Sequence, residues 1–353
     1  MICLNSITLS FIHHIDRYIY FTGVLVKDLL DKGLTVHAAI RDPSKSDRLK
    51  YLTDVADASK GSIKFFKADL LEEGSYLEAI KGCSVVFHTA SPFMTNVPKG
   101  KEQEMLLDPA VKGTKNVLKS ASEVESVKRV VLTSSMYAVC VDAQDTHDVE
   151  KCDESCWNTQ ASTDYNPYAY SKVLAEKAAW EFVKEDRVKW DLVVINPTFV
   201  MGPGLKAHPT SESFQFVQNI GNGLMKYGCP NFGLGVADVR NVAEAHVNAA
   251  FMPEAEGRHI ISGTNTTILS MCQAIKGYPN YPLPKSRAPK TLVWLLAPLM
   301  GMSRKSVKRS CDIEMKLDTS KSVEKLKITY IPLEKTMTDM FAQEIEYGLI
   351  KDP

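Results

Sequence analysis

The stretch Asn166-Pro-Tyr-Ala-Tyr-Ser-Lys-Val-Leu-Ala-Glu-Lys177 places a phenol, Tyr168, four residues before an ammonium, Lys172. Its apolar spacing predicts an amphipathic helix, and residues four apart lie on one face of a helix, so the two side chains should be neighbours. An ammonium beside a tyrosine favours the phenolate and brings the pKa of the phenol toward neutral pH. Both residue types are also common on solvated helix faces, so the surrounding sequence has to decide between a proton-transfer site and a surface.

Strands and helices alternate on both sides of this segment. Apolar runs over residues 34–40, 63–68, 84–88, 129–133 and 191–195 predict strands. Helical periodicity predicts helices over residues 24–30, 76–81, 109–122 and 168–184. Strands that alternate with helices of this length indicate right-handed parallel crossovers. The predicted fold is therefore α/β, a Rossmann-type doubly wound parallel sheet.

The pattern changes after Pro203-Gly204, where glycine and proline become frequent and the elements become shorter. We therefore place a dinucleotide-binding domain at residues 1–202 and a smaller C-terminal substrate lobe mainly at residues 203–353. Helices are expected near residues 213–221 and 303–308. A segment near residues 233–250, with a strand before Val239, is expected to return to the main domain. The apolar run from Thr291 to Met300 contains Pro298 and is too short to span a bilayer, which suits a buried or pocket-lining helix.

Composition narrows the possible partners. The 353 residues contain 42 Lys and Arg against 42 Asp and Glu, so nucleic acid and an anionic membrane surface are not expected partners. The eight cysteines show no metal-ligand repeat, which predicts no metal site and favours a reducing, cytoplasmic setting. The N-terminal residues 1–21 lack a basic start, and charged and histidine residues interrupt their apolar runs, so neither a signal peptide nor a membrane span is expected.

Small and polar residues follow the predicted strands. In open α/β sheets ligands bind outside the carboxyl ends of the strands, near the point where the strand order reverses. The residues at these positions are Arg41, Asp69, Leu70, Thr89, Ala90, Ser91, Ser134, Ser135, Asn196 and Pro197. Ala90 and Ser91 leave room for a flat ligand against the backbone, although each of these residues also suits an ordinary turn.

Arg41 indicates which dinucleotide would bind. An acidic residue at the end of the second strand usually holds the ribose hydroxyls of NAD, whereas an arginine accommodates the 2′-phosphate of NADP. Ala38-Ala39-Ile40 offers no carboxylate before Arg41, and Lys45 adds a second cation. NADP(H) is therefore the expected cofactor, with a surface arginine at a strand end as the alternative interpretation.

Seven segments in this order carry a family likeness. They are Arg41-Asp-Pro43, Ala68-Asp-Leu70, Val86 to Pro92, Thr133-Ser-Ser135, Tyr168 to Lys172, Asn196-Pro197 with Gly202-Pro203, and Asp238 to Ala243. The set resembles the extended short-chain dehydrogenase/reductases, and most of all the branch of dihydroflavonol, cinnamoyl-CoA and microbial aldehyde or methylglyoxal reductases. The likeness runs from about Val24 to the last helix.

The resemblance implies roles for individual residues. Tyr168 would donate a proton to a substrate carbonyl, Lys172 would lower the pKa of Tyr168 and bind the nicotinamide ribose, and Ser135 would hold the substrate oxygen. The cofactor would contact Arg41, Lys45, Asp69, Leu70, Thr89, Ala90, Ser91, Tyr168, Lys172, Pro197 and Val200.

One part of the family pattern is missing. The family begins with a strand and the turn Thr-Gly-x-x-Gly-Phe-Ile-Gly/Ala, whose glycines let backbone N–H groups approach the cofactor pyrophosphate. The equivalent stretch is best placed at Ile15 to Phe21, with Arg17 where a glycine is expected and Tyr20 where a small residue is expected. We read Gly23 as part of the first helix, so the first strand and the turn look degenerate or replaced before residue 24.

Three explanations of this departure remain open. The start of the sequence is a gene-model artefact or a replacement, the turn belongs to a protein that no longer binds cofactor, or Arg17 holds phosphate by charge. We favour the first explanation, because the sequence still contains the complete catalytic set Ser135, Tyr168 and Lys172 that the resemblance implies.

The resulting expectation is NADPH-dependent reduction of an aldehyde or ketone to the alcohol, with tyrosine as proton donor. The alternatives are a non-catalytic binding protein, and a sugar-nucleotide epimerase or hydroxysteroid dehydrogenase on the same fold. The residues do not determine the substrate, the physiological direction or the oligomeric state. Candidates for an apolar pocket are Phe93, Met136, Phe199, Phe214, Met225 and Trp294, each of which also suits plain core.

Overall fold

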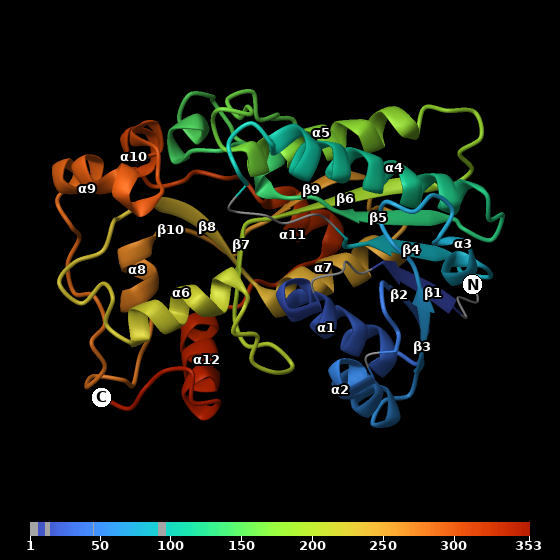
Figure 1. The fold of residues 1–353 in the computed structure, drawn as a ribbon, viewed down its shortest axis with the longest axis horizontal. Coiled ribbons are helices and arrows are strands. Elements are labelled where there is room, and N and C mark those ends of the chain that lie inside the picture. The colour runs from blue at the N-terminus through green and yellow to red at the C-terminus, as the bar shows by residue number, and fades with distance from the viewer. Residues whose placement is uncertain (1–5, 11–14, 45, 91–96) are drawn as a thin grey trace.

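The computed structural model describes residues 6–10, 15–44, 46–90 and 97–353. A seven-stranded parallel sheet forms the larger part of the molecule, in the order β3-β2-β1-β4-β5-β6-β9 (Figure 1). The strands are β1 (Ser6–Ser10), β2 (Thr35–Ile40), β3 (Ser62–Lys67), β4 (Val85–His88), β5 (Arg129–Thr133), β6 (Asp191–Pro197) and β9 (Gly257–Ile261). The order reverses between β1 and β4, as in dinucleotide-binding sheets. The α/β, Rossmann-type doubly wound fold is thereby confirmed.

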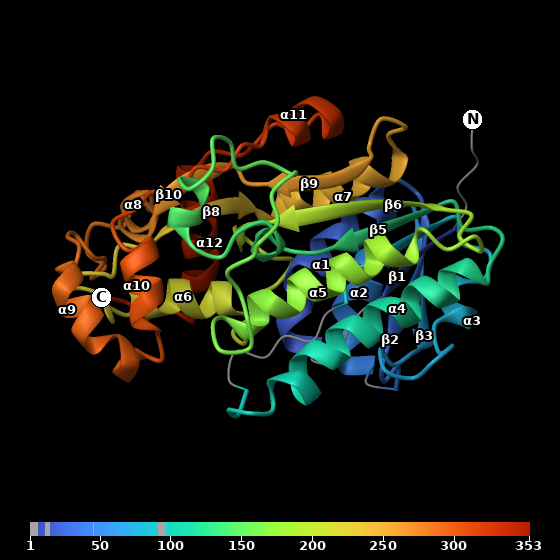
Figure 2. The ribbon, with the colours of Figure 1, turned by 90° about the horizontal axis from the view of Figure 1, so that it is seen from above.

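Helices cover both faces of this sheet (Figures 1 and 2). One face carries α3 (Leu77–Ile80), α4 (Asp108–Ser122) and α5 (Pro167–Phe182). The other carries α1 (Ile15–Asp31), α2 (Ser46–Asp57) and α7 (Val239–Phe251). Apart from α1, the predicted helices and strands of this part agree with the observed ones within two residues.

The central strands are buried on both faces because their side chains alternate between two cores. In β4, Val85 and Phe87 pack in the core beneath α1 and α7, whereas Val86 packs in the core beneath α4 and α5. In β6, Val193 and Val194 divide in the same way. Successive residues of a strand point to opposite faces, so an uninterrupted apolar run is what a sheet covered on both sides requires.

The N-terminus differs from the sequence interpretation in two ways. A strand that was not predicted, β1, lies in the middle of the sheet and pairs in parallel with both β2 and β4. The segment from Ile15 to Phe21, interpreted as a turn before the helix, already belongs to α1, which also contains Gly23. A strand between two others is held by main-chain hydrogen bonds on both sides, which almost any residue supplies, so it needs no distinctive side chains.

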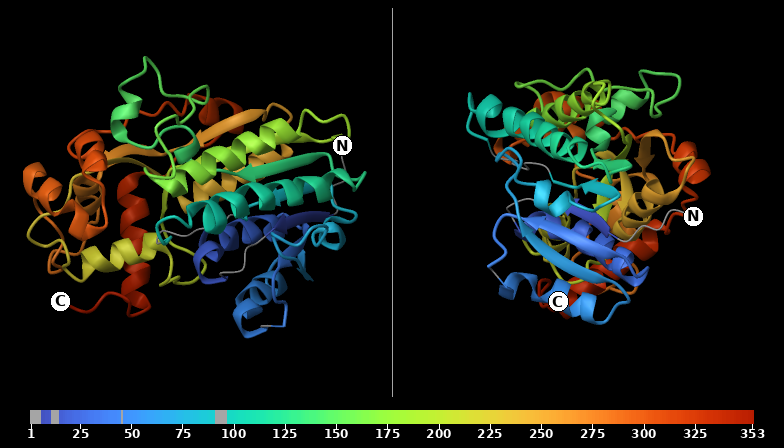
Figure 3. Two further views of the ribbon diagram at one scale, coloured as in Figure 1. Left: turned by 45° about the horizontal axis from the view of Figure 1, so that its top comes forward. Right: turned by 90° about the vertical axis from the view of Figure 1, so that its right-hand side faces the viewer.

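A smaller lobe lies at the carboxyl ends of the central strands (Figure 3). Its three-stranded sheet has the order β10-β8-β7, formed by β10 (Thr264–Thr267), β8 (Gly233–Asp238) and β7 (Phe199–Met201). Around it lie α6 (Glu212–Gly221), α8 (Ile268–Gln273), α9 (Lys290–Leu296), α10 (Arg304–Ser310) and α12 (Leu333–Glu346), while α11 (Ser320–Leu326) packs on β9.

Two expectations about the C-terminal half were wrong. The segment near residues 233–250 was expected to return to the main domain with its strand; its helix α7 does return and covers the larger sheet, but its strand β8 pairs with β7 and β10 of the lobe, and the later strand β9 joins the larger sheet instead. The run from Thr291 to Met300 was expected to be buried or to line a pocket, yet Leu295 and Leu299 are exposed. Within the described ranges, no helix combines the length and the apolar character that crossing a bilayer requires.

Candidate active site

The start of α5 fixes the position of Tyr168. Asn166 adopts a left-handed conformation, with φ of 54°, and its side chain accepts a hydrogen bond from the Ala169 backbone N–H at 3.0 Å. Pro167 follows at the first helical position, where the missing N–H costs nothing and the fixed φ suits the helix. The chain therefore enters the helix abruptly, and Tyr168 stands in its first turn.

Tyr168 and Lys172 are neighbours, as the four-residue spacing predicts. Lys172 Nζ lies 5.7 Å from the centre of the Tyr168 ring, and the lysine is buried. Within the described residues, no hydrogen bond to Lys172 Nζ occurs, so this buried ammonium can still donate. Burial lowers the pKa of Lys172 to about 8, while the carboxylate of Glu176 acts in the opposite direction.

The pKa of Tyr168 shifts in the opposite direction to the expectation. Burial, and secondly the neighbouring Tyr137, raise the pKa of Tyr168 well above its ordinary value. The loss of solvent around the phenol, and not Lys172, therefore sets the direction of this shift. The phenol therefore keeps its proton at neutral pH, which is the form that a proton donor requires.

Ser135 lies beside this pair, at the carboxyl end of β5. It caps the short helix η2 (Met136–Ala138), and its Oγ accepts a hydrogen bond from the Tyr137 backbone N–H at 3.2 Å. The Tyr137 ring meets the Tyr168 ring edge to face, with centroids 6.0 Å apart. The structure thus places Ser135, Tyr168 and Lys172 on two adjoining elements, η2 and α5.

A buried carboxylate lies behind these residues. Glu176 Oε2 accepts hydrogen bonds from Ser134 Oγ at 2.5 Å and Asn196 Nδ2 at 2.8 Å. Its Oε1 accepts from Arg258 Nε at 2.6 Å, and Trp180 Nε1 completes the set at 3.3 Å. Glu176 therefore joins α5 to the ends of β5 and β6 and to β9.

Asn196 connects the carboxylate of Glu176 to the backbone of Ser135. Asn196 Nδ2 donates both to Glu176 and to the backbone oxygen of Ser135, the latter at 3.1 Å. Its Oδ1 is buried without a partner in the described part of the chain. Asn196 can therefore hold Ser135 only while Glu176 fixes the orientation of its amide.

Arg258 neutralises Glu176 in the interior. Its side chain is 7% exposed and that of Glu176 is 0% exposed. The guanidinium lies 3.9 Å from the centre of the Trp157 ring and donates to the backbone oxygens of Glu154 and Cys156 at 2.9 and 2.5 Å. A buried ion pair with these additional hydrogen bonds holds the elements around it in one arrangement.

The expected cofactor residues lie at the strand ends of the larger sheet. Arg41 directly follows β2, and its Nε forms an ion pair with Asp69 Oδ2 at 3.1 Å just after β3. No other hydrogen bond of the Arg41 guanidinium occurs within the described residues, so its Nη groups can still donate. Lys45 and Ser91, also expected here, lie outside the described residues.

The other expected contact residues lie in strands or shortly after them. Leu70 is buried against α4, where a side chain on Gly113 would overlap it. Thr89 and Ala90 are buried just after β4, beside the point where the strand order reverses. Pro197 ends β6, and Val200 lies in β7.

This donor set fits a 2′-phosphorylated dinucleotide in most of its parts. The Nη groups of Arg41 remain available for a phosphate beside its ion pair with Asp69, and Lys172 is a buried donor without a hydrogen bond to the described residues. The pyrophosphate turn is the exception. The β1–α1 connection, residues 11–14, has the sequence Phe-Ile-His-His without glycine, and it lies outside the described residues together with any role of the Arg17 side chain.

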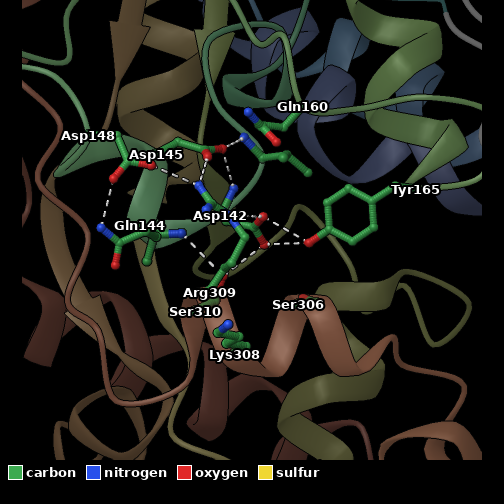
Figure 4. A network of polar contacts seen from close by, with 12 residues as sticks. Asp142, Gln144, Asp145, Asp148, Gln160, Tyr165, Ser306, Lys308, Arg309 and Ser310 are labelled. Carbon is green, nitrogen blue, oxygen red and sulfur yellow. Dashed lines mark hydrogen bonds and ion pairs between the residues drawn. The ribbon is translucent and has the colours of Figure 1, made fainter.

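A second polar network joins the site to the smaller lobe (Figure 4). Asp142, 2% exposed, accepts from the Tyr165 hydroxyl at 2.8 Å on each oxygen, and from Arg309 Nε and Ser310 Oγ of α10. Arg309 also contacts Asp145 at 2.5 Å and Asp148 at 3.0 Å. Burial raises the pKa of Asp142, against the hydrogen bonds from Tyr165 and Ser310. Because Tyr165 lies three residues before Tyr168, α10 is tied to the segment that leads into α5.

The apolar pocket candidates lie in different surroundings. Phe214 is fully buried in the main core and Met136 in a smaller one, while Phe199 packs edge to face on Phe216. Met225 is partly buried, Trp294 is exposed on α9, and Phe93 lies outside the described residues. No group of metal-ligating side chains occurs within the described ranges, and the seven cysteines described there are free thiols.

Sequence reasoning missed the roles of Tyr137, Glu176 and Arg258. Glu176 had a signal, because it follows Lys172 by one helical turn and is the one acidic residue between Asn166 and Lys177. Arg258 had none, since 82 residues separate it from Glu176 and only the pairing of β9 with β6 brings the two together.

Comparison with known proteins agrees with this geometry. The chain is 39% identical over 273 residues to cinnamoyl-CoA reductase CAD2 of Medicago truncatula, covering 76% of this chain and 81% of that protein. It is 33% identical over 279 residues to a (2S)-flavan-3-ol-forming anthocyanidin reductase of Vitis vinifera, covering 75% and 80%. The structure of Gre2 from Candida albicans in complex with NADPH superposes with a TM-score of 0.77 at 26% identity, covering 97% and 99%. A sequence model described as the 3-beta hydroxysteroid dehydrogenase/isomerase family matches residues 21–266, starting after the segment that lacks the glycine-rich turn. The chain therefore belongs to this family of extended short-chain dehydrogenase/reductases.

Proposed function

We propose that the protein is an NADPH-dependent reductase that converts an aldehyde or ketone to the alcohol. The observation that carries the proposal is the pairing of half-buried Tyr168 with buried Lys172 beside Ser135, at the carboxyl end of a dinucleotide-binding sheet. The named relatives are reductases, and the Gre2 structure contains NADPH, which supports both the reaction class and the cofactor.

Each residue has a defined task in this proposal. Arg41 would hold the 2′-phosphate and Lys172 a ribose hydroxyl, because both present donors that the described residues leave unused. When bound, NADPH supplies a hydride to the carbonyl carbon. Tyr168 donates its proton to the carbonyl oxygen, and Ser135 donates a hydrogen bond to the same oxygen as negative charge develops there.

The test is Tyr168→Phe, with Tyr170→Phe on the same helix as the matched control. Removing the proton donor should lower kcat by roughly 100-fold or more, the contribution typical of general acid catalysis, while NADPH affinity stays within about twofold. The control should keep its turnover. Equal turnover of the two variants on a substrate that the wild type reduces would exclude Tyr168 as the donor.

A second candidate function is a non-catalytic binding protein, which the absence of glycine between β1 and α1 favours. Titration of NADPH against the purified full chain separates the two: saturable binding at micromolar cofactor supports the reductase, and no binding at millimolar cofactor supports the alternative. Sugar-nucleotide epimerisation and hydroxysteroid oxidation use the same tyrosine and lysine. A screen that pairs aldehydes and ketones with hydroxysteroids and nucleotide sugars distinguishes these reactions.

A further inference from the structure

Helix α9 lies at the outer end of the smaller lobe (Figures 1 and 2), and the short helix η4 (Ala297–Met300) follows it. Both helices carry exposed apolar side chains. Leu299 is 85% exposed, Leu295 59% and Met300 50%. Leu292, Trp294 and Leu296 are exposed beside them. A soluble protein rarely leaves so many large apolar side chains together in water unless they meet a partner.

The exposure follows from how the helix packs. Val293 and Ala297 are one helical turn apart, and they are buried against Val307 and Cys311 of the α10 segment. The leucines between and after them therefore point away from the lobe. Because α9 already has an inner apolar face that anchors it, its outer apolar face contributes nothing to the core of this chain.

Positive charge is concentrated around the same helices. Between Glu256 and Asp312 the sequence has no acidic residue, and residues 285–309 contain seven cations: Lys285, Arg287, Lys290, Arg304, Lys305, Lys308 and Arg309. The 42 cationic side chains of the whole chain balance its 42 acidic ones, so the rest of the molecule carries a net charge of −7. The zero net charge of the whole chain, which argued against an anionic partner, therefore combines a positive region around α9 and α10 with a negative remainder.

Two of the seven cations are neutralised within the protein. Arg287 pairs with Asp312 at 3.1 Å, and Arg309 binds the aspartates that follow Val141. The other five, which are Lys285, Lys290, Arg304, Lys305 and Lys308, have no carboxylate partner within the described residues. Of these, Lys290 Nζ donates to the backbone oxygens of Lys308 and Cys311, and Lys305 Nζ lies 3.9 Å from the centre of the Tyr165 ring, so Lys285, Arg304 and Lys308 are the cations most open to a partner. The guanidinium of Arg304 lies 4.4 Å from the centre of the Trp294 ring, so charge and apolar surface are adjacent.

We propose that α9, η4 and α10 form a membrane-docking surface that binds the headgroups and outer acyl region of an anionic lipid bilayer. Leucine and methionine side chains enter the boundary region, tryptophan prefers the headgroup level, and the side chains of Lys285, Arg304 and Lys308 meet acidic headgroups. The opposite charge on the rest of the chain orients this end toward the bilayer. A second copy of the chain fits less well, because a two-fold contact would bring the cations of this face against each other.

Sedimentation of the full chain with lipid vesicles tests the proposal. Vesicles of phosphatidylcholine with 30% phosphatidylserine should bind the protein at least tenfold more tightly than phosphatidylcholine alone, and 0.5 M NaCl should remove most of the difference. Leu295→Ser with Leu299→Ser should weaken binding at least tenfold, as should Arg304→Glu with Lys308→Glu.

Matched controls use exposed residues elsewhere. Val323→Ser with Tyr347→Ser removes apolar side chains that are 48% and 51% exposed, and Lys60→Glu with Lys81→Glu reverses charge on the opposite part of the molecule. The apolar control should change vesicle binding by less than twofold, and the charge control by less than the Arg304 and Lys308 reversal. Circular dichroism checks that each variant is folded.

Three results would overturn the proposal. They are equal binding to neutral and anionic vesicles, patch variants that bind as the wild type does, and a wild-type dimer by light scattering that Leu295→Ser with Leu299→Ser converts to monomer. The last result would assign the face to a second copy. Absence of binding to either kind of vesicle is a case of the first result, and in a monomeric wild type it would leave a protein partner as the explanation of the exposed face.

Discussion

Substitution of Glu176 by glutamine should disturb stability and turnover together. The change keeps the size of the side chain but removes its charge and replaces one acceptor oxygen by an amide group. An amide oxygen directed at Arg258 leaves the new NH₂ group facing Ser134 and Asn196. Ser134 can rotate its hydroxyl to accept, but Asn196 presents a donor at 2.8 Å. Asn196 must then turn its amide, and its hydrogen bond to the Ser135 backbone is lost.

The magnitude follows from the burial of the ion pair. Arg258, 7% exposed, would lose its one carboxylate partner among the described residues, and breaking such a buried pair costs about 3 kcal/mol of unfolding free energy or more. Displacement of Ser135 should lower kcat about tenfold, since it removes a donor from the developing oxyanion. NADPH affinity should change by less than about twofold, because Arg41 and Lys172 are not altered.

Glu181→Gln on the same helix provides the control. Glu181 pairs with Lys184 at 2.8 Å, but its side chain is 75% exposed, so this substitution should cost less than about 0.5 kcal/mol. Urea unfolding and steady-state kinetics measure both variants. Adding Arg258→Met to Glu176→Gln should recover about 2 kcal/mol, because it removes the unpaired charge. Equal stability and turnover of the Glu176 and Glu181 variants would refute the reasoning.

Three further substitutions test other parts of the structure. Arg41→Ala should weaken NADPH binding roughly 10- to 100-fold by fluorescence titration and leave NADH binding unchanged, since only the 2′-phosphate loses a charged donor; equal losses for both cofactors would contradict this. Asp142→Asn should lower the unfolding free energy by about 2 kcal/mol in urea, whereas Asp148→Asn, which removes an exposed partner of the same Arg309, should cost less than about 0.5 kcal/mol. Glu344 in α12 has both oxygens buried without a partner in the described part of the chain, and burial raises its pKa to about 9. The stability that its neutral form provides is complete below the unfolded pKa of 4.5 and is lost as pH rises toward 9, so Glu344→Gln should gain about 3 kcal/mol at pH 7 and nothing near pH 4; a gain independent of pH would contradict this assignment.

Local sequence determined most of the α/β layer and the Tyr168–Lys172 pair. Strands β2 to β6 were visible as apolar runs, and α5 as a periodic segment with a proline at its start, because burial on two faces or on one leaves a pattern in neighbouring residues. The four-residue spacing of Tyr168 and Lys172 is itself a local property of a helix.

Tertiary structure alone decided the features that join distant residues. Strand β1 is placed by its main-chain pairing with β2 and β4. Its side chains show no pattern that would have predicted this pairing. Glu176 meets Arg258 across 82 residues, and Asp142 meets Arg309 across 167. The exposure of Leu295 and Leu299 likewise depends on which face of α9 packs against α10. The sequence of an apolar helix is the same whether its faces contact protein or solvent. Only the packing of the whole chain therefore shows which face remains uncovered.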